Sequence, residues 1–175
     1  MKDSTIFALF SSGGFGVIIS YLFLYFTNTL KFLSSYYTKQ EWRFWVISML
    51  ITTASIIGLI VWFSFYQRLE GWQRDLFISS LAVFLAFAML WSVSVFYIEK
   101  YKLNPNYQRP FLLVVGLATV ALLIATVYST DNWLLITAAA IIVWHHLIID
   151  TFWWVSLHQR NYLKTKNYKK NKLSK

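Results

Sequence analysis

Three ionisable residues stand close together in the last apolar stretch of the chain: His145, His146 and Asp150. Ionisable side chains inside such a stretch are costly and point to function by default. His146 and Asp150 are four residues apart and share one face of an α-helix, so the carboxylate can accept a hydrogen bond from the imidazole and fix its tautomer. Trp154 continues that face, and Trp144 precedes the histidines. We take these five residues as the candidate intramembrane polar site.

His145 is expected to serve a different neighbour, because consecutive residues on an α-helix point about 100° apart. Two histidines that splay apart in this way cannot readily clamp one ion, so the sequence predicts no metal site and requires no cofactor. A hydrogen-bonded pair that only stabilises the helix remains the alternative to a functional site. No catalytic residue can be named from a nucleophile–base set, a phosphate-binding loop or a dinucleotide fingerprint.

The run from His146 to Trp154 has the spacing H-x3-D-x3-W. It resembles the signature near the end of several prokaryotic multi-span families, among them the Brp/Blh-type carotenoid-cleaving dioxygenases. Three positions differ from that signature, which has Tyr, Gly and a basic residue at Leu147, Thr151 and Val155. The resemblance implies that His146 and Asp150 stand at a site for a lipophilic substrate or cofactor.

The composition indicates an integral membrane protein. Of the 175 residues, 58% are hydrophobic and 13% are charged, whereas a soluble domain carries about 25% charged residues. So few polar side chains cannot cover a soluble globule, and a chain this apolar is not disordered. The chain has no cysteine, which excludes disulfides and thiolate metal sites.

Five apolar stretches are long enough to cross a bilayer, which takes about 20 helical residues. They are Ile6–Leu30, Phe44–Tyr66, Leu76–Tyr97, Phe111–Tyr128 and Trp133–Leu157. The connections between them are short, so neighbouring helices should pack antiparallel. The sequence predicts an all-α, polytopic membrane protein: one domain at 1–160, an antiparallel bundle of five transmembrane helices, followed by a basic, unstructured tail at 161–175. The first stretch is read as a retained helix because no cleavage pattern follows it.

The positive charges predict the orientation. Thirteen of the sixteen lysines and arginines fall on one side of the five-helix alternation and three on the other. The positive-inside rule puts the thirteen in the cytoplasm, which leaves the N-terminus outside and the C-terminus inside. Seven of them follow His158, where we expect contact with anionic lipid headgroups. This distribution explains the net charge of +9 without nucleic acid as a partner.

Small residues inside the spans predict close helix packing. Gly13, Gly14 and Gly16 lie in the first stretch and Gly58 in the second, and glycines in such helices let neighbouring backbones approach. Glu99 comes at the end of the third stretch, where we expect solvent to reach it.

Two functions remain open. The scarcity of chemical groups favours a non-enzymatic subunit or assembly partner of a larger membrane complex. The alternative is a membrane enzyme or cofactor-binding protein that acts on an isoprenoid, carotenoid or lipid through His146 and Asp150. A transporter or channel is disfavoured because no polar stripe crosses the spans.

Overall fold

The computed structural model describes residues 3–34 and 37–173, and every regular element within those ranges is helical. The elements in chain order are α1 (Ser4–Phe26), α2 (Thr29–Ser34), α3 (Lys39–Val61), η1 (Trp62–Tyr66), α4 (Gly71–Tyr101), η2 (Pro105–Gln108), α5 (Arg109–Val127), α6 (Trp133–Val143), η3 (Trp144–Trp154) and α7 (Val155–Leu173).

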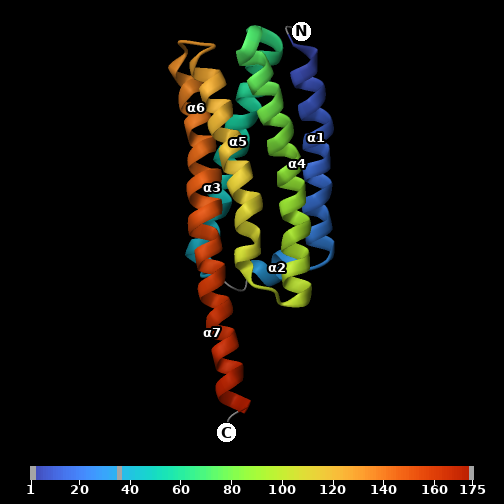
Figure 1. Cartoon of the computed structure of the whole chain (residues 1–175), viewed down its shortest axis with the longest axis vertical. Coiled ribbons are helices and arrows are strands. Elements are labelled where there is room, and N and C mark those ends of the chain that lie inside the picture. The colour runs from blue at the N-terminus through green and yellow to red at the C-terminus, as the bar shows by residue number, and fades with distance from the viewer. Residues whose placement is uncertain (1–2, 35–36, 174–175) are drawn as a thin grey trace.

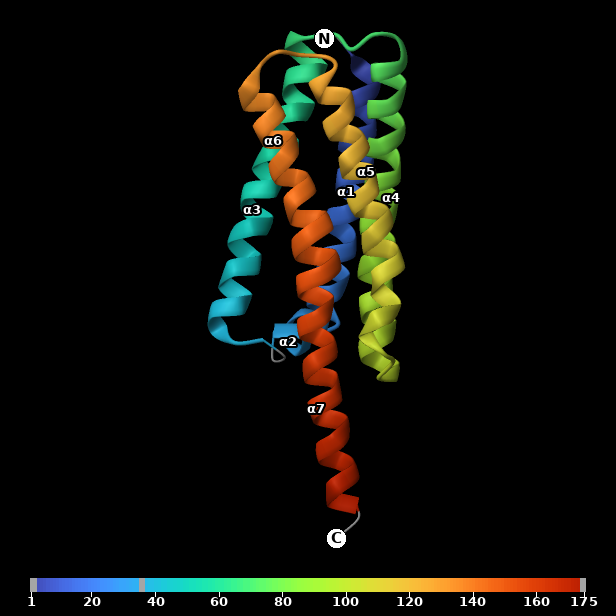
Figure 2. The same cartoon turned by 60° about the vertical axis from the view of Figure 1, so that its left-hand side comes forward.

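Several of these elements join end to end into five long rods, with η1 continuing α3 and with η3 and α7 continuing α6. Each rod is long and apolar enough to cross a membrane, as the composition predicted. The rods run side by side with alternating direction, and the two termini lie at opposite ends (Figures 1 and 2).

Local capping residues set the beginnings of the helices. The Asp3 carboxylate accepts hydrogen bonds from the backbone amides of Thr5 and Ile6 and so caps α1. Thr38 and Glu41 form a reciprocal capping box at the start of α3. Both arrangements satisfy backbone N–H groups that a helix leaves unpaired at its first turn. The first apolar stretch does not stay helical to Leu30, because Asn28 adopts the left-handed conformation with φ of 57°.

The tail differs from the prediction. Residues from Asn161 to Leu173 are helical as part of α7, which extends beyond the end of the bundle (Figures 1 and 2). Lysine and leucine favour helix, and a helix that continues an existing one needs no new nucleus. Arg160 also holds the start of this segment to α3 through Glu41, with Nη2 3.0 Å from Oε1. The last two residues of the tail lie outside the described ranges.

Close helix contacts occur at two of the four predicted glycines. A Cβ atom at Gly13 would lie 2.6 Å from Cδ1 of Leu85, and one at Gly16 would lie 2.5 Å from Sδ of Met89. These glycines therefore let α1 lie against α4. Among the described residues, an added Cβ at Gly14 would meet only Phe10 of its own helix and one at Gly58 would meet nothing within 4 Å, so neither position shows the close helix contact seen at Gly13 and Gly16.

Gly116 on α5 makes a close approach that the sequence analysis did not single out. An added Cβ there would lie 3.1 Å from the Cα of Leu147 on η3. The backbone of α5 thus supports the segment that carries the candidate polar site.

Candidate functional site

The candidate site lies on a π-helix, not on an α-helix. The segment η3 covers eleven residues, Trp144–Trp154, and its wider turn brings residues five apart onto one face. The hydroxyl of Thr151 donates to the carbonyl of His146, five residues back, over 2.8 Å. His145 and Asp150 are also five residues apart, so this geometry moves His145 toward the carboxylate.

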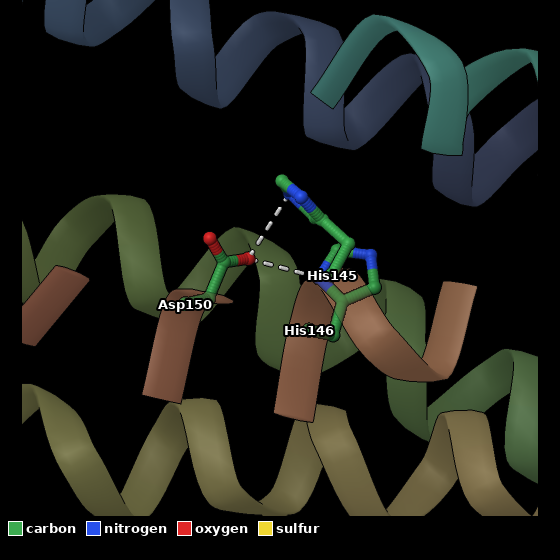
Figure 3. Close-up of side chains that lie close together, drawn as sticks. All are labelled: His145, His146 and Asp150. Carbon is green, nitrogen blue, oxygen red and sulfur yellow. Dashed lines mark hydrogen bonds and ion pairs between the residues drawn. The ribbon is translucent and has the colours of Figure 1, made fainter. Parts of the chain in front are cut away.

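One oxygen of Asp150 lies between the two imidazoles. Its Oδ2 is 3.0 Å from Nδ1 of His146 and 3.5 Å from Nε2 of His145. Figure 3 marks both contacts with dashed lines. The hydrogen-bonded pair of His146 and Asp150 therefore has the geometry predicted for it. Ligand atoms of all three side chains lie within 4.8 Å of one another.

His145 has the separate neighbour that was expected, because its Nδ1 lies 2.8 Å from the hydroxyl of Ser48 on α3. The splay of the two imidazoles is smaller than expected, since the other nitrogen of His145 lies 3.5 Å from the carboxylate that His146 also contacts. That expectation assumed the 100° rotation per residue of an α-helix. In the wider π-helix the residue before the predicted pair turns toward the same carboxylate (Figure 3). The three side chains form one cluster, called the His–His–Asp cluster below.

Two residues of α3 hold the outer atoms of this cluster. Trp45 donates from Nε1 to the second oxygen of Asp150, Oδ1, over 3.0 Å. The hydroxyl of Ser48 lies 2.8 Å from Nδ1 of His145. An ionised carboxylate only accepts hydrogen bonds, so with Asp150 ionised Nδ1 of His146 donates to Oδ2. Neither Trp45 nor Ser48 had been singled out, because they are about a hundred residues away in sequence.

The two tryptophans of the predicted site have different surroundings. Trp154 is buried, with its ring stacked on Trp45 at 4.7 Å and on Tyr37 at 4.1 Å between centroids. It therefore backs the tryptophan that holds Asp150. Trp144 is 60% exposed, and the structure does not bring it to the cluster.

A large apolar groove opens beside the cluster. It has a volume of about 820 Å³ and is lined by side chains of α1, α3 and α4, such as Phe10, Ile56 and Phe84, together with His145 and His146. The volume is within the range of small-molecule sites in proteins. The His–His–Asp cluster forms the polar part of an otherwise apolar wall.

Two buried polar atoms of residues at this groove have no hydrogen-bond partner within the part of the chain that the structure describes: Nε2 of His146 and Oγ1 of Thr52. Native proteins rarely leave such atoms unpaired, because each costs about 1–3 kcal/mol. Both atoms are closed off from solvent in this structure, although their side chains belong to the lining of the groove.

A second buried polar network lies outside the predicted site. Trp91 donates to Gln108 over 3.1 Å, the Gln108 amide lies 3.2 Å from Nδ1 of His158, and Nε2 of His158 lies 3.0 Å from Glu99. Glu99 is only 7% exposed, so the expectation that solvent reaches it is wrong. Because the Gln108 carbonyl is occupied by Trp91, its NH₂ donates to His158, which places the imidazole proton on Nε2 toward Glu99. The network joins α4, η2 and α7.

Comparisons with protein-family models, with curated proteins and with solved structures gave no match. The local resemblance of the last helix to carotenoid-cleaving enzymes therefore gains no support, and the function is argued from the geometry alone.

Proposed function

We propose that the protein spans a membrane and binds a lipophilic small molecule that carries a polar group. The N-terminus would lie outside and α7 in the cytoplasm, supported by the thirteen-to-three division of positive charges. The groove would then open toward the acyl-chain region, from which an apolar ligand enters without crossing water. The tail lysines would meet anionic headgroups.

The observation that carries this proposal is an apolar groove whose lining includes the polar side chains of His145, His146 and Thr52. An apolar groove alone would accept lipid chains without selection. His146 Nε2 and Thr52 Oγ1 are buried beside the groove and would offer unused hydrogen-bonding capacity to a ligand that displaced the side chains covering them. A ligand that offers a polar atom at the right depth would satisfy them, and pure hydrocarbon would not.

The tautomer of His146 specifies the kind of polar group. A neutral imidazole that donates from Nδ1 to Asp150 keeps a lone pair on Nε2. That lone pair accepts a hydrogen bond, so the metal-free site favours a hydroxyl over a carbonyl. Among the expected classes this selects a lipid or isoprenoid alcohol. The same arrangement could remove the proton of that hydroxyl, so the enzymatic alternative stays open.

A subunit role is the second candidate, and the surface of α1 favours it. This helix presents large apolar side chains outward, with Phe15 65% and Phe26 76% exposed. Such a face fits either lipid or a helix of a partner protein. The structure contains a single chain, so the two candidates are separated only by experiment.

The test uses two glycine variants of matched chemistry. Gly14 lines the groove, and an added Cβ there meets only Phe10, at 3.9 Å. Gly14→Leu therefore fills the groove without a backbone clash. Gly58 faces open space on α3, so Gly58→Leu adds the same side chain elsewhere.

Each protein is purified in mild detergent, and the bound small molecules and polypeptides are identified by mass spectrometry. We expect one lipophilic alcohol in the wild type and in Gly58→Leu, loss of it in Gly14→Leu, and reduced retention in His146→Leu. The same mixture of bulk lipids in all four proteins would contradict the proposal. A stoichiometric second polypeptide without a specific small molecule would establish the subunit role.

A further inference from the structure

We propose that His145, His146 and Asp150 form a binding site for a divalent first-row transition-metal ion. The inference goes beyond the proposed function: it shares the groove wall with the ligand site but does not need the ligand. It rests on the three ligand atoms that the π-helix brings together.

The separations of these atoms fit a bound ion. Zinc binds histidine nitrogen and carboxylate oxygen at about 2.0–2.2 Å, which in a tetrahedral site places neighbouring ligand atoms about 3.4 Å apart. Oδ2 of Asp150 lies 3.0 Å and 3.5 Å from the two histidine nitrogens. The ligand nitrogens of His145 and His146 lie within 4.8 Å of each other. To reach the tetrahedral separation, these two nitrogens need to approach each other by at most about 1.4 Å.

The polar atoms of the cluster that face away from its centre form hydrogen bonds with other residues, as such atoms do in metal sites. Histidine and carboxylate ligands of metals usually engage a further residue through their other polar atom, which fixes ring orientation and tautomer. Here Ser48 engages Nδ1 of His145 and Trp45 engages Oδ1 of Asp150. With those atoms occupied from outside, Nε2 of His145 and Oδ2 of Asp150 are directed toward each other and toward His146 (Figure 3).

The ligand set selects the class of ion. Two imidazoles and one carboxylate suit zinc, iron and related ions, whereas magnesium and calcium prefer oxygen ligands throughout. Three protein ligands leave at least one coordination position open. Because His145 and His146 both line the groove, that position would be reached from the groove.

A bound ion would also change which ligand His146 prefers. An imidazole that gives its Nδ1 lone pair to a metal keeps its proton on Nε2. Nε2 would then donate a hydrogen bond to a carbonyl, whereas in the metal-free site it accepts one from a hydroxyl. The metal content therefore bears directly on the identity of the lipophilic ligand.

The experiment measures zinc bound by the purified full chain, produced with an affinity tag that contains no histidine. The protein is stripped with a chelator, titrated with Zn²⁺, and analysed for metal per chain by mass spectrometry, with elution volume as the check on folding. We expect about one zinc per chain in the wild type, unaffected by excess Mg²⁺. His145→Gln and Asp150→Asn should lose it. Trp45→Phe should retain it with affinity weakened about tenfold to hundredfold.

The control is His158→Gln, which alters the third histidine of the chain within the separate buried network. This variant should bind zinc like the wild type. A folded wild type that binds no zinc, or cluster variants that bind as much as it does, would overturn the metal site. The lipophilic ligand is scored independently on the metal-free protein, so its presence there would leave the proposed function standing.

Discussion

The hydrogen bond from Trp45 to Asp150 links α3 to the π-helix, and its strength can be measured by a double-mutant cycle. Trp45→Phe removes the donor and keeps most of the ring, which stacks on Trp154. Asp150→Leu removes the acceptor. If the two residues interact, the double variant must lose less stability than the two single losses together.

The geometry of this hydrogen bond sets the coupling energy that we expect. Hydrogen bonds inside membrane proteins show coupling energies of about 0.6 kcal/mol on average and about 1.7 kcal/mol at most. The acceptor here is a carboxylate, and charge-assisted hydrogen bonds are roughly twice as strong as neutral ones. The N–O distance of 3.0 Å is favourable and both side chains are buried. We therefore expect a coupling energy of about 1–2 kcal/mol.

The two single variants should lose different amounts of unfolding free energy. Asp150→Leu leaves two short hydrogen bonds without an acceptor, those of Trp45 and His146. At about 1–3 kcal/mol for each unpaired buried donor, the loss is about 2–6 kcal/mol. Trp45→Phe leaves one carboxylate oxygen without its donor and should cost about 1–3 kcal/mol.

The assay is reversible unfolding in mixed detergent micelles, followed by tryptophan fluorescence, with a chelator present so that a bound metal does not contribute. A matched cycle combines Asp150→Leu with Trp72→Phe. Trp72 is 52% exposed and forms its ring contact with Tyr128, so this second cycle should be additive. A coupling below about 0.3 kcal/mol for Trp45 and Asp150 would refute the reasoning, because independent sites are additive within that margin.

Three further predictions test other contacts. Gly13→Val should destabilise the protein by about 1–3 kcal/mol through overpacking, measured by thermal unfolding against Gly58→Val, which should be close to neutral. Burial alone raises the pKa of Asp3, but hydrogen bonds from Arg74 and two backbone amides outweigh it and hold that pKa below its ordinary value. The stability that Asp3 contributes is therefore present above about pH 3.9 and is lost as the pH falls through its lower folded-state pKa. In Asp3→Asn, the free energy of unfolding should therefore depend less on pH at the acidic end of a pH titration. His158→Leu removes the hydrogen bonds to Gln108 and Glu99, while Glu99 keeps Lys102 as an ion-pair partner. The change should cost about 1–3 kcal/mol, and unchanged unfolding would show that this network contributes nothing.

The five rods could be predicted because each depends on local information. A run of about 20 apolar residues is visible in the sequence and allows one structure in lipid. The pair of His146 and Asp150 was also accessible, since four residues span one helical turn. Both predictions use only neighbours along the chain, and the structure agrees with both.

The remaining parts of the site depend on contacts between distant segments. Trp45 and Ser48 reach the cluster because α3 packs beside the last rod, and no spacing in the sequence indicates that. Glu99 and His158 each stand near the end of an apolar stretch, where solvent is the ordinary expectation. Their burial follows from the packing of η2 against both α7 and α4.

The π-helix itself is the feature that a role in stability alone does not explain. An α-helix already joins His146 to Asp150, so a structural pair needs no wider turn. The π-helix has poorer hydrogen-bond geometry and is rare, and where it occurs it is frequently at a functional site. Its effect here is to add His145 to a carboxylate that already had a partner. The short π-helix η1 offers a comparison, since it ends its rod and carries neither an acid nor a histidine. The π-helix therefore brings two imidazoles and a carboxylate together beside a large groove, and this is the arrangement that the proposed ligand and the proposed ion would use.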